Sequence, residues 1–402
     1  MRDNAGGPGE RNLGLMIYLD NNASTPLDPE VREAMAAALD LYGNPSSVHS
    51  DGRRARRAIE EARDEVALLV GARSDEIFFT SGGTEANALA ILGSVAGGPG
   101  RVVTSAVEHP SVREPLARLC EVRGLEAVAV SPDRTGALDA GKIRDAAVAG
   151  TLLVSLMAAN NEYGGMYPVE EIAPELRSRG ILVHTDAVQA AGKVPVDARR
   201  WEVDLLSISA HKIHGPKGVG ALYVRKGLAL RAHTPGGGQE KRIRGGTENT
   251  VGIVGFGAAA RIARERPAEE RESIARLRDR LERGILERIP GTNAVGAGAP
   301  RLPNTSTVVF GGISGETLLF RLDLDGVAVS VGSACSSGTL TPSPSILALG
   351  FPKEQAKGAV RFSLSRFTTA EEIDRVLDLL PRAAADVRDA RRVAAAPISV
   401  PG

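Results

Sequence analysis

The sequence predicts an α/β fold, with a large domain around a mostly parallel seven-stranded sheet and a small α+β domain after it. Seven short runs of β-branched or apolar residues lie in the first part of the chain, and segments with helical spacing separate most of them. This alternation is typical of a parallel sheet covered by helices on both faces. After about residue 256 the pattern changes to a long charged helical stretch with few strands.

The predicted strands show where functional side chains are expected. They cover residues 76–80, 101–106, 127–130, 152–157, 181–185, 205–209 and 220–224. Ligands of such sheets bind beyond the carboxyl ends of the strands, so polar residues that directly follow a strand are candidates for a site.

The sequence after about residue 256 predicts other elements. They are a long charged helical stretch over 258–289, a strand over 305–310, a helix from Glu316, a Gly/Ser-rich loop, a strand over 359–364 and a helix from Thr369. The predicted division is a disordered extension (1–16), a large domain (17–256), a small domain (257–390) with a loop at 330–344, and a loose tail (391–402). The first part of the large domain could pack with the small domain.

The composition is balanced in charge and poor in cysteine. Forty-nine basic and 49 acidic side chains cancel, which argues against nucleic acid or a membrane surface as the main partner. The arginine-rich run at 53–57 precedes acidic residues at helical spacing, as in a solvated helix face. No apolar run is long enough to span a bilayer, and two cysteines are too few for a disulfide framework. We therefore expect a cytoplasmic protein.

Lys212 follows the strand at 205–209 and precedes a Gly-Pro-Lys-Gly turn. A lysine held rigidly at this place suits a Schiff base, and pyridoxal phosphate enzymes require one. Such enzymes also need an acid for the pyridine nitrogen and a cradle for the phosphate. The alternative is an ordinary solvated lysine at a strand end.

Two other strand ends provide candidates for those parts. After the strand at 76–80, Gly83 and Thr84 begin a helical pattern, where backbone N–H groups and a hydroxyl can hold a phosphate. A capped turn of the same composition is the alternative. Asp186 follows the strand at 181–185, where a carboxylate can pair with a protonated pyridine nitrogen and Gln189 can bond the ring oxygen. A helix N-cap is the alternative role of Asp186.

Three further residues have reactive or hydrogen-bonding side chains just after a predicted strand or in a loop. His109 closes the strand at 101–106 and could stack on a cofactor and move protons, although a histidine before a proline can be structural. Asn161 follows the strand at 152–157 and could bond cofactor or substrate, or form an ordinary turn. Cys335 lies in a loop of small residues and could be a mobile nucleophile, or alternatively an incidental loop thiol. Cys120, at helical spacing, is expected in a core.

The chain resembles the cysteine desulfurases of the NifS and IscS type, within the fold-type I, class V aminotransferase-like pyridoxal phosphate enzymes. Ser-Ala-His-Lys at 209–212 and Gly-Ser-Ala-Cys at 332–335 carry the resemblance together. Further matching segments lie at 18–29, 43–49, 236–240, 244–249 and 361–368, so the resemblance runs nearly end to end. Pro344 and Leu347 depart from the family pattern, which leaves the stiffness and docking of the cysteine loop open.

The resemblance implies a role for each candidate in a homodimer. Lys212 would carry the cofactor, Asp186 would pair with its ring nitrogen, and His109 would stack on the ring and shuttle a proton. The remaining cofactor contacts would be Gly83, Thr84, Asn161, Gln189, Ser209, His211 and, from the other subunit, Thr247. Asn161 and Arg361 would hold the substrate, with Arg361 gripping its carboxylate through two parallel bonds.

The implied reaction converts L-cysteine to L-alanine. Cys335, as a thiolate, would attack the substrate sulfur, become a persulfide and deliver the sulfur to an iron–sulfur scaffold or another carrier. No intrinsic metal is implied, although Cys335 could contact nascent iron on a scaffold. A selenocysteine lyase or an aminotransferase of the same fold is the first alternative, and a non-catalytic sulfur-assembly subunit is the second.

Overall fold

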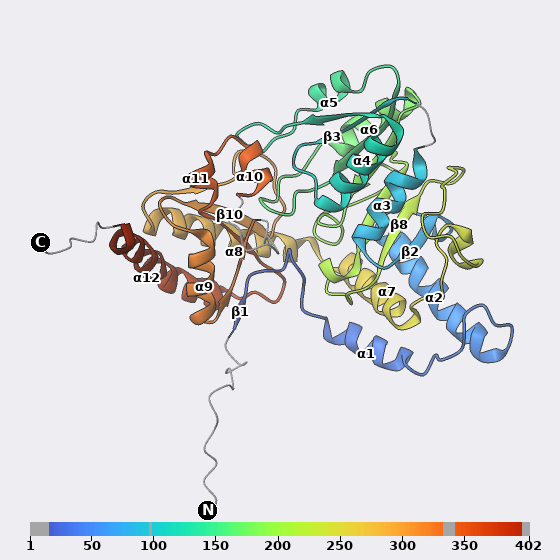
Figure 1. Cartoon of the computed structure of the whole chain (residues 1–402). Helices are drawn as coiled ribbons and strands as arrows, with labels where there is room; N and C mark the ends of the chain where they lie inside the picture. Colours follow the sequence, from blue (N-terminus) through green and yellow to red (C-terminus); the bar gives the residue numbers. More distant parts are fainter. Residues whose placement is uncertain (1–15, 96–98, 333–341, 396–402) are drawn as a thin grey trace, which may run out of the picture.

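A computed structural model describes residues 16–95, 99–332 and 342–395, and it contains the predicted α/β fold (Figure 1). All seven predicted strands are present in one sheet, and each boundary lies within one residue of its predicted position. Their order is β2-β8-β7-β6-β5-β3-β4. The bounds are Ile77–Thr80 (β2), Arg101–Ser105 (β3), Glu126–Val130 (β4), Thr151–Met157 (β5), Leu182–Asp186 (β6), Leu205–Ser209 (β7) and Gly220–Val224 (β8). Neighbouring strands from β4 to β7 are parallel, and β8 is antiparallel to both β2 and β7.

Helices cover both faces of this sheet because its strands are apolar on both sides. In β7, Leu205 packs in one core cluster, whereas Leu206 and Ile208 pack in the cluster on the opposite face. Helices α3 (Gly83–Ser94) and α4 (Pro110–Arg123) lie on the first face. The second face packs against α2 (Ser50–Leu69), α6 (Val169–Ser178) and α7 (Thr250–Glu265). Helices α1 (Pro29–Ala38), which packs on α7, and α5 (Ala140–Ala146) complete this part.

A second, antiparallel sheet has the strand order β12-β13-β10-β9 and its own apolar core. Its strands are Thr292–Ala294 (β9), Thr305–Phe310 (β10), Ser330–Val331 (β12) and Ala359–Ser363 (β13). The helices around it are Ala268–Arg288 (α8), Gly315–Leu324 (α9), Pro344–Ala348 (α10), Lys353–Ala356 (α11) and Ala370–Ala395 (α12). The start of the chain joins this part, because β1 (Ile17–Tyr18) pairs with β11 (Val327–Ala328).

The predicted helical stretch over 258–289 consists of two helices, α7 and α8. Pro267 separates them. A proline disfavours helical backbone angles at the residue before it. Arg266 accordingly has extended angles of φ −66° and ψ 136°. Phe256 and Ala259 of α7 both pack in the core beneath the large sheet. The domain boundary after residue 256, inside α7, stays a prediction.

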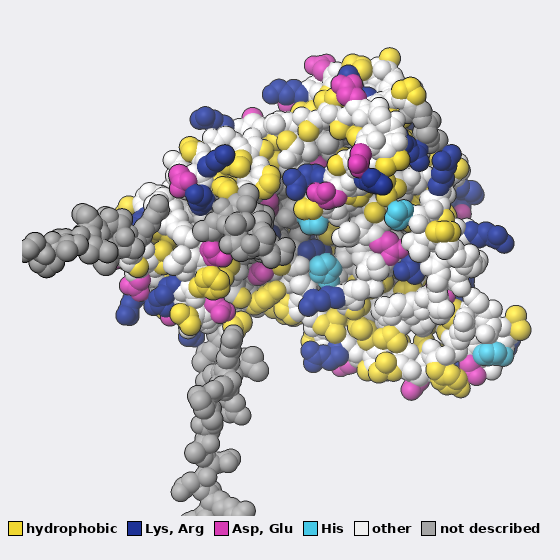
Figure 2. All heavy atoms as spheres, in the orientation of Figure 1, with side chains coloured by type: hydrophobic (Ala, Val, Ile, Leu, Met, Phe, Trp, Pro, Cys, Tyr) yellow, Lys and Arg dark blue, Asp and Glu magenta, His cyan; other side chains and the backbone are white. Residues whose placement is uncertain are grey.

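Basic and acidic side chains are interspersed on the face of the molecule that Figure 2 shows. The arginine run at 53–57 lies on α2, where Arg54 pairs with Asp51 at 3.2 Å and Arg56 with Glu60 at 3.0 Å. This supports the predicted solvated helix face. Within the ranges that the structure describes, no helix combines the length and apolarity needed to cross a bilayer.

Candidate functional site

The carboxyl ends of the parallel strands open onto a cavity of about 410 Å³, which is within the usual size range of ligand pockets. Ten of the predicted site residues line it: Gly83, Thr84, His109, Asn161, Asp186, Gln189, Ser209, His211, Lys212 and Arg361. Thr247 is exposed elsewhere on the surface of the chain. Cys335 lies outside the described residues, but β12, four residues before it, contributes Ser330 and Val331 to the cavity wall.

Lys212 ends the short 3₁₀ turn that follows β7 and is held by main-chain oxygens. Its Nζ donates to the carbonyl oxygens of Asn22 at 2.6 Å and Ala23 at 2.8 Å. Burial, with the nearby positive charge of Arg361, lowers the pKa of this amine to about 8. A substantial fraction of Lys212 is therefore uncharged at mildly alkaline pH, which is the form that can act as a nucleophile.

Asp186 is the last residue of β6, and its carboxylate is fixed within the site. Oδ2 accepts a bond from Nδ2 of Asn87 at 2.7 Å, and Oδ1 accepts one from the main-chain N–H of Val188 at 2.9 Å. The chain continues from Asp186 into turns and then β7, so the alternative role as a helix N-cap does not apply. Each oxygen retains acceptor capacity for a cationic ring nitrogen.

The N-terminus of α3 has the features of an anion cradle. No side chain in the described ranges caps this helix, and the residue before it, Gly82, has a φ of 156°, which favours glycine. A Cβ atom at Gly83 would lie 2.8 Å from Cγ2 of Val188, so glycine is required by space as well. The buried hydroxyl of Ser209, which also lines the cavity, has no partner among the described residues. Uncapped N–H groups beside an unpaired hydroxyl fit a phosphate group.

His109 has structural contacts at Nδ1, and its Nε2 has no hydrogen bond to another described residue. It caps α4, because its Nδ1 accepts a bond from the main-chain N–H of Ser111 at 3.1 Å. In the neutral ring the proton is therefore on Nε2. Burial lowers the pKa of His109, and the structural role does not exclude proton transfer through Nε2.

Arg361 of β13 reaches the cavity from the second sheet. Its Nη1 donates to the carbonyl oxygen of Asn161 at 3.0 Å, and its Nη2 pairs with Asp20 at 2.7 Å. Nε is buried without a partner among the described residues. The β12–β13 register aligns Arg361 with Ser330, so the guanidinium lies beside the segment that leads to Cys335.

Asn22 is a central residue that sequence reasoning missed. Its carbonyl oxygen accepts bonds from Lys212 and from Nε2 of Gln189, the latter at 2.9 Å. Its side-chain oxygen accepts one from Nζ of Lys193 at 3.0 Å, and Lys193 also donates to Oε1 of Gln189 at 2.5 Å. Asn87 and Glu162, which also line the cavity, were missed too. Asn22 lies in the matching segment at 18–29, which is the one signal that could have indicated it.

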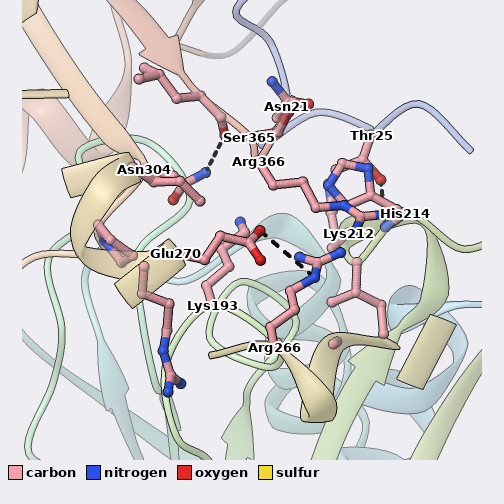
Figure 3. Close-up of a pocket in the computed structure, with 17 residues that line it drawn as sticks. Asn21, Thr25, Lys193, Lys212, His214, Arg266, Glu270, Asn304, Ser365 and Arg366 are labelled. Carbon is pink, nitrogen blue, oxygen red and sulfur yellow. Dashed lines mark hydrogen bonds and ion pairs between the residues drawn. The ribbon is translucent and has the colours of Figure 1, made fainter. Parts of the chain in front are cut away.

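Lys212 also lines a second, smaller cavity, together with Lys193, Arg266 and Glu270 (Figure 3). Arg266 and Glu270 form a loose pair there, with 3.9 Å between Nε and Oε1. The accessible space is about 50 Å³, which suits a few water molecules and is too small for a cofactor. The larger cavity is therefore the candidate active site.

Comparisons with known proteins show the family to which the chain belongs. The family model described as aminotransferase class-V matches residues 17–376. A cysteine desulfurase of Sinorhizobium fredii is 47% identical, and the match covers 94% of this chain and 98% of the relative. The chain belongs to the cysteine desulfurases of the class V aminotransferase family. A cysteine desulfurase IscS of Dictyoglomus turgidum is 46% identical, over 91% of this chain and 94% of the relative.

A solved structure of a NifS-like protein has the same fold as this cysteine desulfurase. The TM-score is 0.85 at 36% identity, and the match covers 92% of this chain and all of the other. The family depends on pyridoxal phosphate. The unpaired Ser209 hydroxyl, the uncapped α3 N-terminus and the orientated Asp186 carboxylate fit that cofactor. The part of the chain that the structure describes contains no group of three or more His, Cys, Asp or Glu residues that could bind a metal ion.

Proposed function

We propose that the protein converts L-cysteine to L-alanine and transfers the sulfur to Cys335 as a persulfide. The convergence of Lys212, Asp186 and the α3 N-terminus on one cavity, with β12 in its wall, carries this proposal. Cys335 is four residues beyond Val331. Because an extended chain spans at most about 3.6 Å per residue, the Cα of Cys335 lies within about 14 Å of that of Val331.

Each residue that would hold the cofactor has a suitable donor or acceptor. Lys212 would hold it through the side-chain amine, Asp186 would pair with the ring nitrogen, and Gln189 would bond the ring oxygen. The phosphate would lie at Gly83 and Thr84, with Ser209 and His211. Pyridoxal phosphate, when bound, supplies an electron sink that stabilises negative charge at the substrate Cα.

The substrate would be held by Arg361 and Asn161, and protons would be moved by His109 and Lys212. To grip a carboxylate with two nitrogens, Arg361 would exchange its contact with Asp20 for the substrate. The Cys335 thiolate would attack the substrate sulfur, forming a sulfur–sulfur bond. The carbon–sulfur bond would break with its electron pair on carbon, and a proton would complete L-alanine.

The proposal extends to a cytoplasmic homodimer with an external sulfur acceptor. Thr247 is exposed in the single chain, which is compatible with its reaching the phosphate of a partner subunit. The acceptor would be an iron–sulfur scaffold or another sulfur carrier, and Cys335 could contact nascent iron there. The cysteine-poor sequence supports the compartment, and Cys120 is a free thiol on α4.

Product analysis tests the proposed reaction against its alternatives. With L-cysteine and a thiol reductant, we expect the cofactor-loaded protein to release L-alanine and sulfide in equal amounts. Formation of a keto acid instead of alanine would indicate an aminotransferase. Much faster turnover of L-selenocysteine would indicate a lyase for that substrate, and no product at all would indicate a non-catalytic assembly subunit.

Replacement of Asp186 by Asn should lower kcat without unfolding the protein. The amide has nearly the same shape but no charge to hold a proton on the ring nitrogen, and losing a buried charge partner costs about 3 to 5 kcal/mol. This corresponds to a decrease of about 10²- to 10⁴-fold in kcat. Steady-state kinetics check the prediction, and Asp197→Asn, at a half-buried turn outside the cavity, is the matched control. Equal rates for Asp186→Asn and wild type would contradict the assigned role.

A further inference from the structure

We propose that Glu162 is a positioning residue whose carboxylate joins the two ends of the segment that carries Cys335. This inference rests on the proposed function, because it concerns how the thiol is kept near the cavity. Glu162 lines that cavity and is buried, with 9% of its surface exposed. The segment leaves the described structure after Gly332 and re-enters it just before Ser343.

Both ends meet the same carboxylate. On the far side of the segment, the hydroxyl of Ser343 donates to Oε2 of Glu162, and the hydroxyl of Ser345 donates to Oε1 at 2.8 Å. On the near side, the backbone of Gly332 packs directly against Glu162. A Cβ atom at Gly332 would lie 2.5 Å from Oε2 and 2.8 Å from Cβ of Ser343, so no side chain fits there.

Glu162 is itself fixed by two parts of the fold. Its main-chain N–H donates to Oδ1 of Asn160 at 2.8 Å, in the turn after β5. Its carbonyl oxygen accepts a bond from the hydroxyl of Thr307, in β10 of the second sheet, at 2.8 Å. The carboxylate therefore has a defined position between the two sheets, and bonds to a charged acceptor are stronger than those between neutral groups.

Ser343 connects this contact to helix α10. While its hydroxyl proton is donated to Glu162, its oxygen accepts bonds from the main-chain N–H groups of Ser345 at 3.1 Å and Ile346 at 3.3 Å. Pro344 occupies the first position of α10, where a proline is well tolerated. The departure from the family pattern at Pro344 is thus compatible with an ordered helix start next to Glu162.

The joined ends limit where Cys335 can reach. Cys335 is three residues beyond Gly332, so its Cα lies within about 11 Å of the Gly332 Cα. Tethering a reactive group by both ends of its segment raises its effective concentration near the tether point. The tether point is a wall of the cavity, so the contact favours attack on a bound substrate over excursions into solvent.

Three variants separate this role from a general effect on the site. We expect Glu162→Gln to slow single-turnover formation of the Cys335 persulfide by about ten- to a hundredfold, because the amide provides one acceptor oxygen instead of two. Ser345→Ala, which leaves the charge near His109 unchanged, should slow it about tenfold. Ser345→Thr keeps the hydroxyl and should restore the rate to within about twofold.

The binding step provides the internal reference. In all three variants, the change in cofactor absorbance on adding L-alanine should occur at the same concentration as in wild type, and Ser178→Ala, at an exposed serine, should change nothing. If Ser345→Ala transfers sulfur as fast as wild type, the inference is wrong, even when Glu162→Gln is slow. If Cys335→Ala retains turnover, the proposed function fails instead, which is a different result.

Discussion

Replacement of Lys212 by Ala should remove the covalently held cofactor and abolish turnover of L-cysteine. The Nζ of Lys212 is held at the cavity by two carbonyl oxygens, those of Asn22 and Ala23. Lys212 is also a proposed proton carrier, and loss of such a group lowers kcat by about 10²- to 10⁴-fold. Absorbance spectra of the dialysed protein and sulfide assays check both expectations.

The lowered pKa of Lys212 predicts that cofactor uptake by the wild-type protein depends on pH. The amine is protonated below about pH 8, and only the neutral amine can capture an aldehyde. The rate at which cofactor-free protein takes up pyridoxal phosphate should therefore rise with pH and level off above about pH 8. A rate that continues to rise up to the ordinary lysine pKa of 10.5 would contradict the effect of burial. Lys226→Ala, at a turn outside the cavity, is the control.

Replacement of Cys335 by Ala should stop sulfide release while cofactor binding persists. The residue is the proposed acceptor of the substrate sulfur, and removal of a nucleophile lowers kcat by roughly 10³-fold or more. Lys212, Asp186 and the α3 N-terminus are untouched, so the absorbance change on adding L-cysteine should remain. Cys120→Ala is the matched control, because this thiol lies on α4 outside the cavity and has a pKa raised by burial. Full sulfide release by Cys335→Ala would exclude the persulfide route.

Local sequence signals were sufficient for the sheet and for the residues at the strand ends. Apolar runs bounded by turn residues gave all seven strands, and the carboxyl edge then located Lys212, Asp186 and His109. The break between α7 and α8 could have been found from Pro267, because a proline there cannot continue the preceding hydrogen-bond pattern. The helical spacing of apolar and charged residues continues on both sides of Pro267, so the spacing alone did not indicate the break.

Other parts of the site depend on contacts between distant segments. Asn22 supports Lys212 through a main-chain carbonyl, which every residue type possesses, so the side chain gives no signal for it. Arg361 pairs with Asp20, near the opposite end of the chain. Glu162 accepts a hydrogen bond from Ser343, and the spacing of these two residues in the sequence does not predict that contact. Such pairs become visible only when the two sheets are placed together.

The most direct test of the central claim follows the sulfur atom in a single turnover. Cofactor-loaded protein is mixed with less than one equivalent of L-cysteine without reductant, alkylated and digested, and the two cysteine peptides are weighed by mass spectrometry. The account predicts that the peptide containing Cys335 gains the mass of one sulfur atom and that L-alanine appears in the same amount, while the Cys120 peptide is unchanged. Formation of L-alanine with no sulfur on Cys335, or with the sulfur on Cys120, would contradict it.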